Sequence, residues 1–286
     1  MKKSTLLHLR FPFSFFLLPV FLFGCAIQKE IVWWQAGLTF VILHFLVYPA
    51  SNGYNSYYDK DEKSIGGLKS PPQVSKELYW TALIMDGLAL ALGFLISELF
   101  VLMVFIYGLV SKAYSHPSVR LKKMPITGWL AAGIFQGYFT LLISVVGVGG
   151  VGLQGLLDAK LQFAAVLTTI MLFGSYPMTQ IYQHEEDSKR GDKTLSLKLG
   201  IPGTFHFTAA FFSFSTLLFV LFFLRYYDVL TAGVFVAGLS PVLAFFGNWY
   251  LKARKNPEHV NFENTMRLNW ISSICLNAFF LWLFFS

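Results

Sequence analysis

Two groups of polar side chains recur at the same spacing, each where a long apolar run ends. Each group holds a tyrosine, two amides and a carboxylate at positions i, i+4, i+7 and i+11: Tyr48, Asn52, Asn55 and Asp59 form the first stripe, and Tyr176, Gln180, Gln183 and Asp187 form the second stripe. This spacing places the members of each stripe on one face of a helix. Oxygen-rich groups at a hydrocarbon boundary are costly unless a cation compensates them. The cation we expect is a hard metal such as Mg²⁺, shared with a phosphate-bearing substrate.

The composition indicates a membrane protein. The chain has 286 residues, of which 55% are hydrophobic and 13% are charged, and its mean hydropathy is +0.57. Soluble domains carry about 25% charged residues. The 31 phenylalanines would be difficult to bury in one soluble core, whereas lipid accepts them. We therefore expect an all-α, polytopic membrane protein.

Apolar windows of about 20 residues mark the expected membrane spans. Nine such windows are present, at residues 9–27, 31–55, 77–97, 98–114, 126–147, 161–183, 203–224, 229–250 and 268–286. The positions of the basic residues give an independent indication of topology. With a cytoplasmic N-terminus, nineteen of the 22 Lys and Arg fall on the cytoplasmic side, and only Lys29, Lys160 and Arg225 lie opposite. This asymmetry follows the positive-inside rule and puts both stripes on the cytoplasmic face.

The net charge of +7 is therefore a signal of topology, compatible with an anionic substrate. No separate basic domain indicates a nucleic-acid partner. We expect a single domain over residues 1–286 with two related halves, about 1–124 and 125–250, and an added ninth helix.

Two charged residues lie within expected spans. Arg10 begins the first span, where it either anchors the helix at the membrane surface or contacts an anion. Asp86 lies about ten residues into the third span, where an isolated carboxylate is costly. Pairing with a neighbouring helix is the interpretation that we favour for Asp86 over a proton relay or a substrate contact.

Four segments, in order along the chain, resemble motifs of the UbiA-type intramembrane prenyltransferases. Asn55-Ser-Tyr-Tyr-Asp59-Lys-Asp61-Glu-Lys63 resembles the family's first aspartate-rich motif, and Gln183-His-Glu-Glu-Asp187 with Gly191-Asp-Lys-Thr194-Leu resembles the second. Lys69-Ser-Pro-Pro72 is similar to a proline-containing basic element, and Tyr114 to Lys123 resembles a basic loop of the family. Together they lie between residues 55 and 195, in the order that the family shows.

The resemblance implies nine transmembrane helices around a central cavity, with a cytoplasmic cap that binds a polyprenyl diphosphate through Mg²⁺. By residue-for-residue correspondence it implies that Asn55, Asp59 and Asp187 hold the metal and that Asp59 and Asp187 are catalytic. We expect Asp61, which lies beside the first motif's last position, as a further metal ligand. It implies diphosphate contacts for Arg10, Lys69, Arg120 and Lys122, and it implies that Tyr114 orients the diphosphate head of the substrate.

Two positions depart from the family pattern. Lys63 stands where the first motif usually ends in Asp, and Gln183 stands where the second motif usually begins with Asp. Asp61, together with Glu185 or Glu186, supplies carboxylates nearby, so Gln183 and Glu186 are expected to support the second motif. Lys63 is expected to reach the diphosphate as a fixed cation in place of part of a second metal.

The function that these features predict is Mg²⁺-dependent transfer of a polyprenyl group from its diphosphate to an aromatic or other nucleophilic acceptor, in lipid-quinone or related isoprenoid synthesis. A non-catalytic transporter or lipid-binding protein on the same scaffold is the alternative. Inverted repeats or spans broken at mid-membrane would favour a transporter. Here the polar residues gather at one face, which favours the enzyme.

Overall fold

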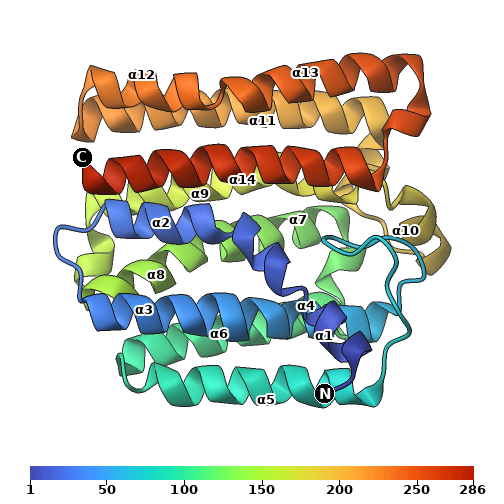
Figure 1. Cartoon of the computed structure of the whole chain (residues 1–286), viewed down its shortest axis with the longest axis horizontal. Helices are drawn as coiled ribbons and strands as arrows, with labels where there is room; N and C mark the ends of the chain where they lie inside the picture. Colours follow the sequence, from blue (N-terminus) through green and yellow to red (C-terminus); the bar gives the residue numbers. More distant parts are fainter.

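The computed structural model describes residues 1–286 as a bundle of helices with no β-strand (Figure 1). The first half contains α1 (Lys3–Leu9), η1 (Phe11–Phe16), α2 (Leu18–Ala26), α3 (Trp33–Val41), η2 (Ile42–Val47), α4 (Tyr48–Asp59), α5 (Lys76–Gly93), α6 (Glu98–Ser115) and η3 (Leu121–Lys123). The remainder contains α7 (Pro125–Gly133), η4 (Ile134–Phe139), α8 (Thr140–Gly149), η5 (Gly155–Leu157), α9 (Ala159–Gln180), α10 (His184–Arg190), α11 (Leu195–Tyr226), α12 (Val229–Gly238), α13 (Ser240–Lys255), η6 (Pro257–His259) and α14 (Phe262–Phe285).

Seven helices are long and apolar enough to cross a membrane, and an eighth span is obtained if the bent pair Lys3–Phe16 and Leu18–Ala26 counts as one. The expected count of nine is therefore not confirmed. The window at 77–97 is the one that is not counted, because α5 carries three charged residues, Lys76, Glu77 and Asp86. The all-helical, polytopic membrane fold that we expected is confirmed.

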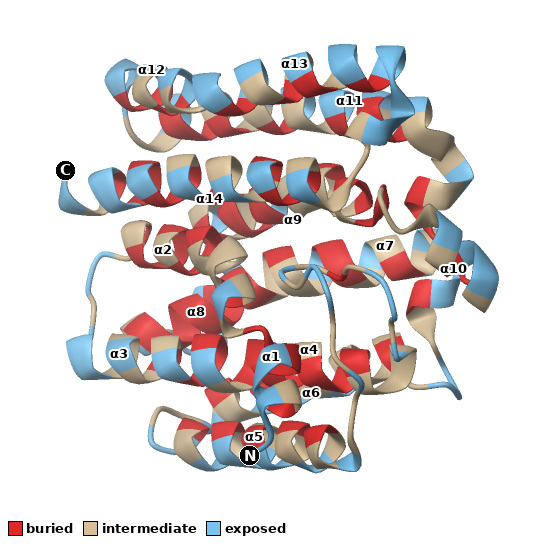
Figure 2. Cartoon of the chain, turned by 45° about the vertical axis from the view of Figure 1, so that its right-hand side comes forward, coloured by how far each residue is buried: buried red, intermediate tan, exposed pale blue.

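The burial pattern agrees with a lipid environment. Large apolar side chains on the outer helices are exposed, including Trp33 at 70% and Phe94 at 66% (Figure 2). Inside the bundle, Phe23 of α2 stacks on Phe280 of α14, with ring centroids 4.6 Å apart. The phenylalanines thus serve both a packed interior and a lipid-facing surface.

Asp86 forms an ion pair with Lys112 of α6. Neither residue lines the main cavity of the protein. The pair joins neighbouring helices α5 and α6 and so agrees with the structural interpretation of Asp86.

The polar connections gather at one end of the bundle. Figure 1 places the loop after α4, the short helix α10 and the α13–α14 connection at the same end, opposite the C-terminus. The two stripes end at this end of the bundle, because Asp59 closes α4 and Asp187 lies in α10. The proposed division into two halves stays a prediction.

Close packing sets the position of α9. A Cβ atom on Gly137 of η4 would lie 2.6 Å from the Cα atom of Thr169 in α9, so only glycine allows this approach. The Tyr138 N–H donates to Thr169 Oγ1 at 2.9 Å. Both η2 and η4 are π-helical turns, which widen the helix locally and are frequent near functional sites.

Candidate functional site

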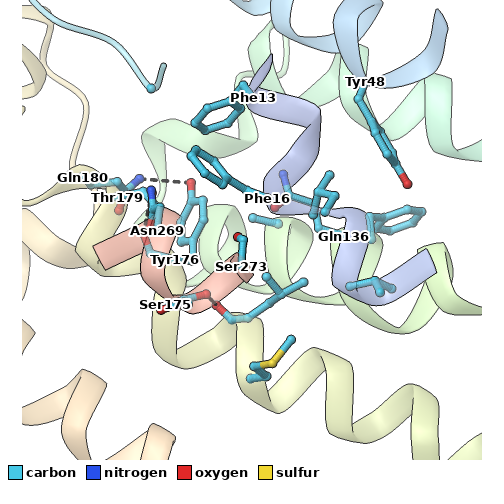
Figure 3. A pocket seen from close by; sticks show the side chains of 18 of the residues that line it. Phe13, Phe16, Tyr48, Gln136, Ser175, Tyr176, Thr179, Gln180, Asn269 and Ser273 are labelled. Carbon is cyan, nitrogen blue, oxygen red and sulfur yellow. Dashed lines mark hydrogen bonds between the residues drawn. The ribbon is translucent and has the colours of Figure 1, made fainter. Parts of the chain in front are cut away.

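One large cavity, with a volume of about 370 Å³, joins the polar end of the bundle to its apolar interior. All eight residues of the two stripes line it. Its deeper wall is largely aromatic and aliphatic and includes Phe16, Phe219 and Leu276. Figure 3 shows Phe13, Phe16, Tyr48, Tyr176 and Ser273 around this space. The cavity can therefore hold a molecule with a charged head and an apolar body.

Asp59 is held at the mouth of the cavity by two cations. The helix α4 ends at this residue because Lys60 adopts a left-handed conformation, with φ of 51°. The Asp59 carboxylate is 4% exposed, lies 3.3 Å from Arg120 Nη2 and pairs with Lys122 Nζ. A buried carboxylate requires such partners.

Arg120 connects the basic loop to the segment after α10. It adopts a left-handed φ of 44°, which is costly for a residue other than glycine. Its Nε and Nη2 atoms each donate to the Asp192 carboxylate at 2.9 Å. These hydrogen bonds raise the pKa of Arg120. Burial would raise the pKa of Asp192, but the hydrogen bonds from Arg120 outweigh it and lower that pKa.

Arg190 pairs with carboxylates from two segments. Its guanidinium contacts Asp61 in the loop after α4 and lies 3.0 Å from Asp187 within α10. Gly191, with φ of 72°, turns the chain so that the Asp192 carboxylate returns to within 3.4 Å of Arg190 Nε. Burial raises the pKa of Asp187 to about 6 although Arg190 opposes the shift. Burial, followed by the nearby Asp59, also raises the pKa of Asp61.

Three amides in the stripes use their NH₂ groups to bind protein. Asn55 Nδ2 donates to Ser115 Oγ at 2.8 Å, Gln180 Nε2 donates to Tyr176 Oη at 3.0 Å, and Gln183 Nε2 donates to Ser64 O at 3.1 Å. The Gln180 Oε1 atom is buried and has no hydrogen-bond partner. The amide orientations thus leave oxygen atoms free at a site that also holds carboxylates.

These donors are of the type that Mg²⁺ prefers, namely carboxylate and amide oxygens. No three His, Cys, Asp or Glu side chains are grouped so as to hold a metal ion by themselves. The carboxylates face Arg120, Lys122 and Arg190 instead. The residues thus fit Mg²⁺ by donor type, but further oxygen ligands and a rearrangement of ion pairs are needed to complete a site.

Two other expected residues, Arg10 and Tyr114, also line the cavity. Arg10 adopts a left-handed φ of 49° and donates to Gly66 O and Asn52 O, each at 3.1 Å. The guanidinium therefore links the first helices to the loop after α4. Tyr114 and Tyr176 share a hydrogen bond between their hydroxyl groups.

Not all of the residues expected from the sequence reach the cavity. Eight of them line it, namely Arg10, Asn55, Asp59, Asp61, Tyr114, Lys122, Gln183 and Asp187. The other four do not line it, namely Lys63, Lys69, Arg120 and Glu186. Arg120 nevertheless forms an ion pair with Asp59, which does.

Three of those four hold loops together. Lys63 is 58% exposed and lies 2.6 Å from Glu185, and Lys69 is 70% exposed and pairs with Glu263 of α14. Glu186 Oε1 accepts the N–H groups of Glu62 and Lys63. The direct diphosphate contacts expected of Lys63 and Lys69 stay predictions, and both ammonium groups are engaged elsewhere in this structure.

Arg190 and Asp192 were not among the expected site residues, yet both line the cavity. Arg190 follows Asp187 by three positions and precedes Gly191, which is the spacing of an ion pair at a helix end closed by glycine. That local signal identifies Arg190 as a partner of Asp187. Nothing local indicates its contact with Asp61, which lies 129 residues away in the sequence.

Comparison with known proteins identifies a family and a set of solved structures with a similar fold. The sequence profile of the UbiA prenyltransferase family matches residues 16–271. A comparison with curated protein sequences gives no match. The fold is similar to that of a UbiA homologue from Archaeoglobus fulgidus bound to GPP and Mg²⁺, with a TM-score of 0.70, 19% identity and coverage of 99% of this chain and 100% of that chain.

The same homologue bound to DMAPP and Mg²⁺ gives a TM-score of 0.70 at 18% identity, covering 99% of both chains. A digeranylgeranylglyceryl phosphate synthase gives a TM-score of 0.63 at 17% identity, also covering 99% of both chains. These likenesses show a shared fold over the full length of the chain.

Proposed function

The chain belongs to the UbiA prenyltransferase family and is a prenyltransferase, and we propose that it transfers a polyprenyl group from a polyprenyl diphosphate to an aromatic or other nucleophilic acceptor. A lipid quinone or a related isoprenoid is the product class that we propose. One observation carries the proposal: a single cavity is lined by both polar stripes, which bring their carboxylates to its mouth, and by an aromatic and aliphatic wall beyond them. A prenyl diphosphate has the same division into a charged head and an apolar tail.

We infer that Mg²⁺ accompanies the diphosphate. Asn55, Asp59, Asp61 and Asp187 would hold it, since they supply amide and carboxylate oxygens on both sides of the cavity mouth. When bound, the metal would neutralise negative charge that develops on the diphosphate. The solved relatives that hold GPP or DMAPP together with Mg²⁺ support this inference.

The residues of the chain would act on the head of the donor substrate. Lys122 lines the cavity and can donate to the diphosphate, while Arg120 adds positive charge from behind Asp59. Such preorganised charge favours departure of the diphosphate with the electron pair of the allylic C–O bond. Tyr114 and Tyr176, linked by their hydroxyl groups, would orient the head at the base of the polar region.

The apolar part of the cavity would protect the allylic carbocation that remains. Its walls are rich in aromatic side chains, among them Phe16, Phe135 and Phe219, whose π-faces attract a cation. The membrane interior also limits the access of water. The acceptor then forms the new bond to the prenyl carbon and releases one proton, so that the products are the prenylated acceptor, diphosphate and H⁺.

Formation of prenylated product tests this function. Purified protein with Mg²⁺, prenyl diphosphates of several lengths and a panel of aromatic acceptors should yield a product whose mass equals the acceptor plus the prenyl group minus one hydrogen. Mass spectrometry identifies the donor and the acceptor together. Absence of product across a panel that includes phenolic and other nucleophilic acceptors would contradict the proposal.

We also propose that the polar end of the bundle and the N-terminus face the cytoplasm, because nineteen of the 22 Lys and Arg lie on that side. Reporter fusions at residues 65, 118, 192 and 258 should all report a cytoplasmic location, and a fusion after residue 286 should report the opposite side. A non-cytoplasmic signal at any of the four internal sites would contradict the proposed orientation.

A further inference from the structure

Arg190 bridges the two sides of the cavity mouth. Its guanidinium contacts Asp61 from the loop after α4 and Asp187 from α10, and its Nε atom lies 3.4 Å from Asp192. Arg190 and these three carboxylates all line the cavity. Arg190 is the last residue of α10, and the carboxyl end of a helix favours a cation. Local geometry and three acidic partners therefore hold the positive charge at this point.

The guanidinium retains capacity for a ligand. The Nε atom of Arg190 is buried and has no hydrogen-bond partner, since its 3.4 Å approach to Asp192 does not give a hydrogen bond. The side chain is nevertheless 21% exposed, at the cavity. A guanidinium carries five N–H donors in a planar fork that matches a phosphate as well as it matches a carboxylate.

The other cations near the mouth either bind different carboxylates or lie outside the cavity. Arg120 makes two hydrogen bonds of 2.9 Å to Asp192, and Lys122 pairs with Asp59. Lys63 and Lys69 lie outside the cavity. Among these cations, only Arg190 forms ion pairs with both Asp61 and Asp187. These are carboxylates that would hold the metal from opposite sides of the mouth.

We propose that Arg190 is an exchangeable counter-ion: it neutralises Asp61 and Asp187 in the substrate-free protein and transfers its guanidinium to the diphosphate when a prenyl diphosphate binds, which frees both carboxylates for Mg²⁺. The inference rests on the proposed function, since it takes the diphosphate as the ligand of the site. The exchange replaces carboxylate acceptors by phosphate oxygens, which bind the same fork. Mg²⁺ then takes the place of the guanidinium on oxygen ligands that suit it.

The exchange couples the two ligands. Mg²⁺ binds weakly while Arg190 occupies the carboxylates and more tightly once the diphosphate has drawn the guanidinium away. By linkage, Mg²⁺ must then raise the affinity for diphosphate by the same factor. The role that the sequence suggested for Lys63, a fixed cation beside the diphosphate, falls to Arg190 in this arrangement.

Calorimetric titration of MgCl₂ into the substrate-free protein in detergent tests the first half of the exchange. Arg190→Gln removes the competing cation and should tighten Mg²⁺ binding at least about tenfold, one decade of affinity being 1.4 kcal/mol. Lys189→Gln is the matched control, because Lys189 lies on the same helix, is 69% exposed and pairs only with Glu185. Equal Mg²⁺ affinity in wild type and Arg190→Gln would overturn the proposal.

Binding of inorganic pyrophosphate without Mg²⁺ tests the second half. Wild type and Lys189→Gln should bind it alike, whereas Arg190→Gln should bind it at least about tenfold more weakly. An unchanged affinity in Arg190→Gln would show that the guanidinium does not move to the diphosphate. If Arg190→Gln does not fold, Arg190→Lys decides, because it keeps the charge and loses the planar fork: weaker pyrophosphate binding supports the exchange and unchanged binding overturns it.

These titrations contain no prenyl donor and no acceptor. A protein that shows the expected shifts in Mg²⁺ and pyrophosphate binding but yields no prenylated product would contradict the proposed function alone. A protein that yields product while Arg190→Gln binds Mg²⁺ and pyrophosphate as wild type does would contradict the exchange alone.

Discussion

Asp59→Asn and Asp187→Asn should each lower the rate of prenyl transfer by about 10²–10³. Each replacement keeps the shape of the side chain and removes one carboxylate charge from the cavity mouth. Asp59 is 4% exposed and Asp187 is 6% exposed, so water cannot substitute for the lost charge. Initial rates of diphosphate release at saturating Mg²⁺ and donor would measure the effect.

The control for these variants is Glu62→Gln. Glu62 lies in the loop after α4, is exposed and does not line the cavity. It should release diphosphate at the wild-type rate. Thermal unfolding in detergent separates a catalytic defect from a folding defect, because Asp59→Asn leaves Lys122 without its carboxylate partner. Wild-type turnover by both aspartate variants would contradict the assignment of the metal-holding residues.

A tryptophan at Ser273 should strongly reduce the use of long donors relative to short ones. Ser273 of α14 is 4% exposed and lines the cavity between Asn269 and Leu276, beyond the polar mouth (Figure 3). An indole there would fill space that the prenyl tail needs. Burial of a methylene contributes about 0.8 kcal/mol, so loss of the five additional carbons of a geranyl group relative to a dimethylallyl group removes about 4 kcal/mol, or about 10³ in kcat/KM.

The measurement is the ratio of kcat/KM for geranyl and longer diphosphates to that for dimethylallyl diphosphate. Ser273→Trp should lower this ratio by up to about 10³, whereas Ser273→Ala, which leaves the space open, should keep it. A Ser273→Trp protein that folds and retains the wild-type ratio would show that the tail lies elsewhere.

Local periodicity explains why so much of the site was predictable. Asn55 and Asp59 belong to one helix, so their spacing alone determines that they face the same direction. Composition likewise indicates the membrane, because a chain with this share of apolar residues cannot hide them in water. The span at α5 was the exception, because α5 contains an ion-paired carboxylate, Asp86, that hydropathy alone does not interpret.

For the second stripe, the sequence predicted which residues face the site but not the backbone conformation that holds them there. Gln180 closes α9 and Asp187 lies in the separate helix α10, with a turn at residues 181–183 between them. Both residues still line the cavity, because α10 lies at the polar end of the bundle, where α9 ends (Figure 1). A continuous helix was the simplest interpretation of the spacing, and the turn changes the path of the chain while keeping the polar face.

The membrane class, the two stripes and the acidic and basic composition of the cavity mouth could all be predicted, since each depends on residues that are close along the chain. The pairing of cations with carboxylates could not be predicted, because it depends on the folded positions of distant segments. Lys63 lies two residues from Asp61, yet it pairs with Glu185, whereas Arg190 reaches Asp61 across 129 positions. Long side chains on loops follow no period, so their partners depend on how the loops fold over the end of the bundle.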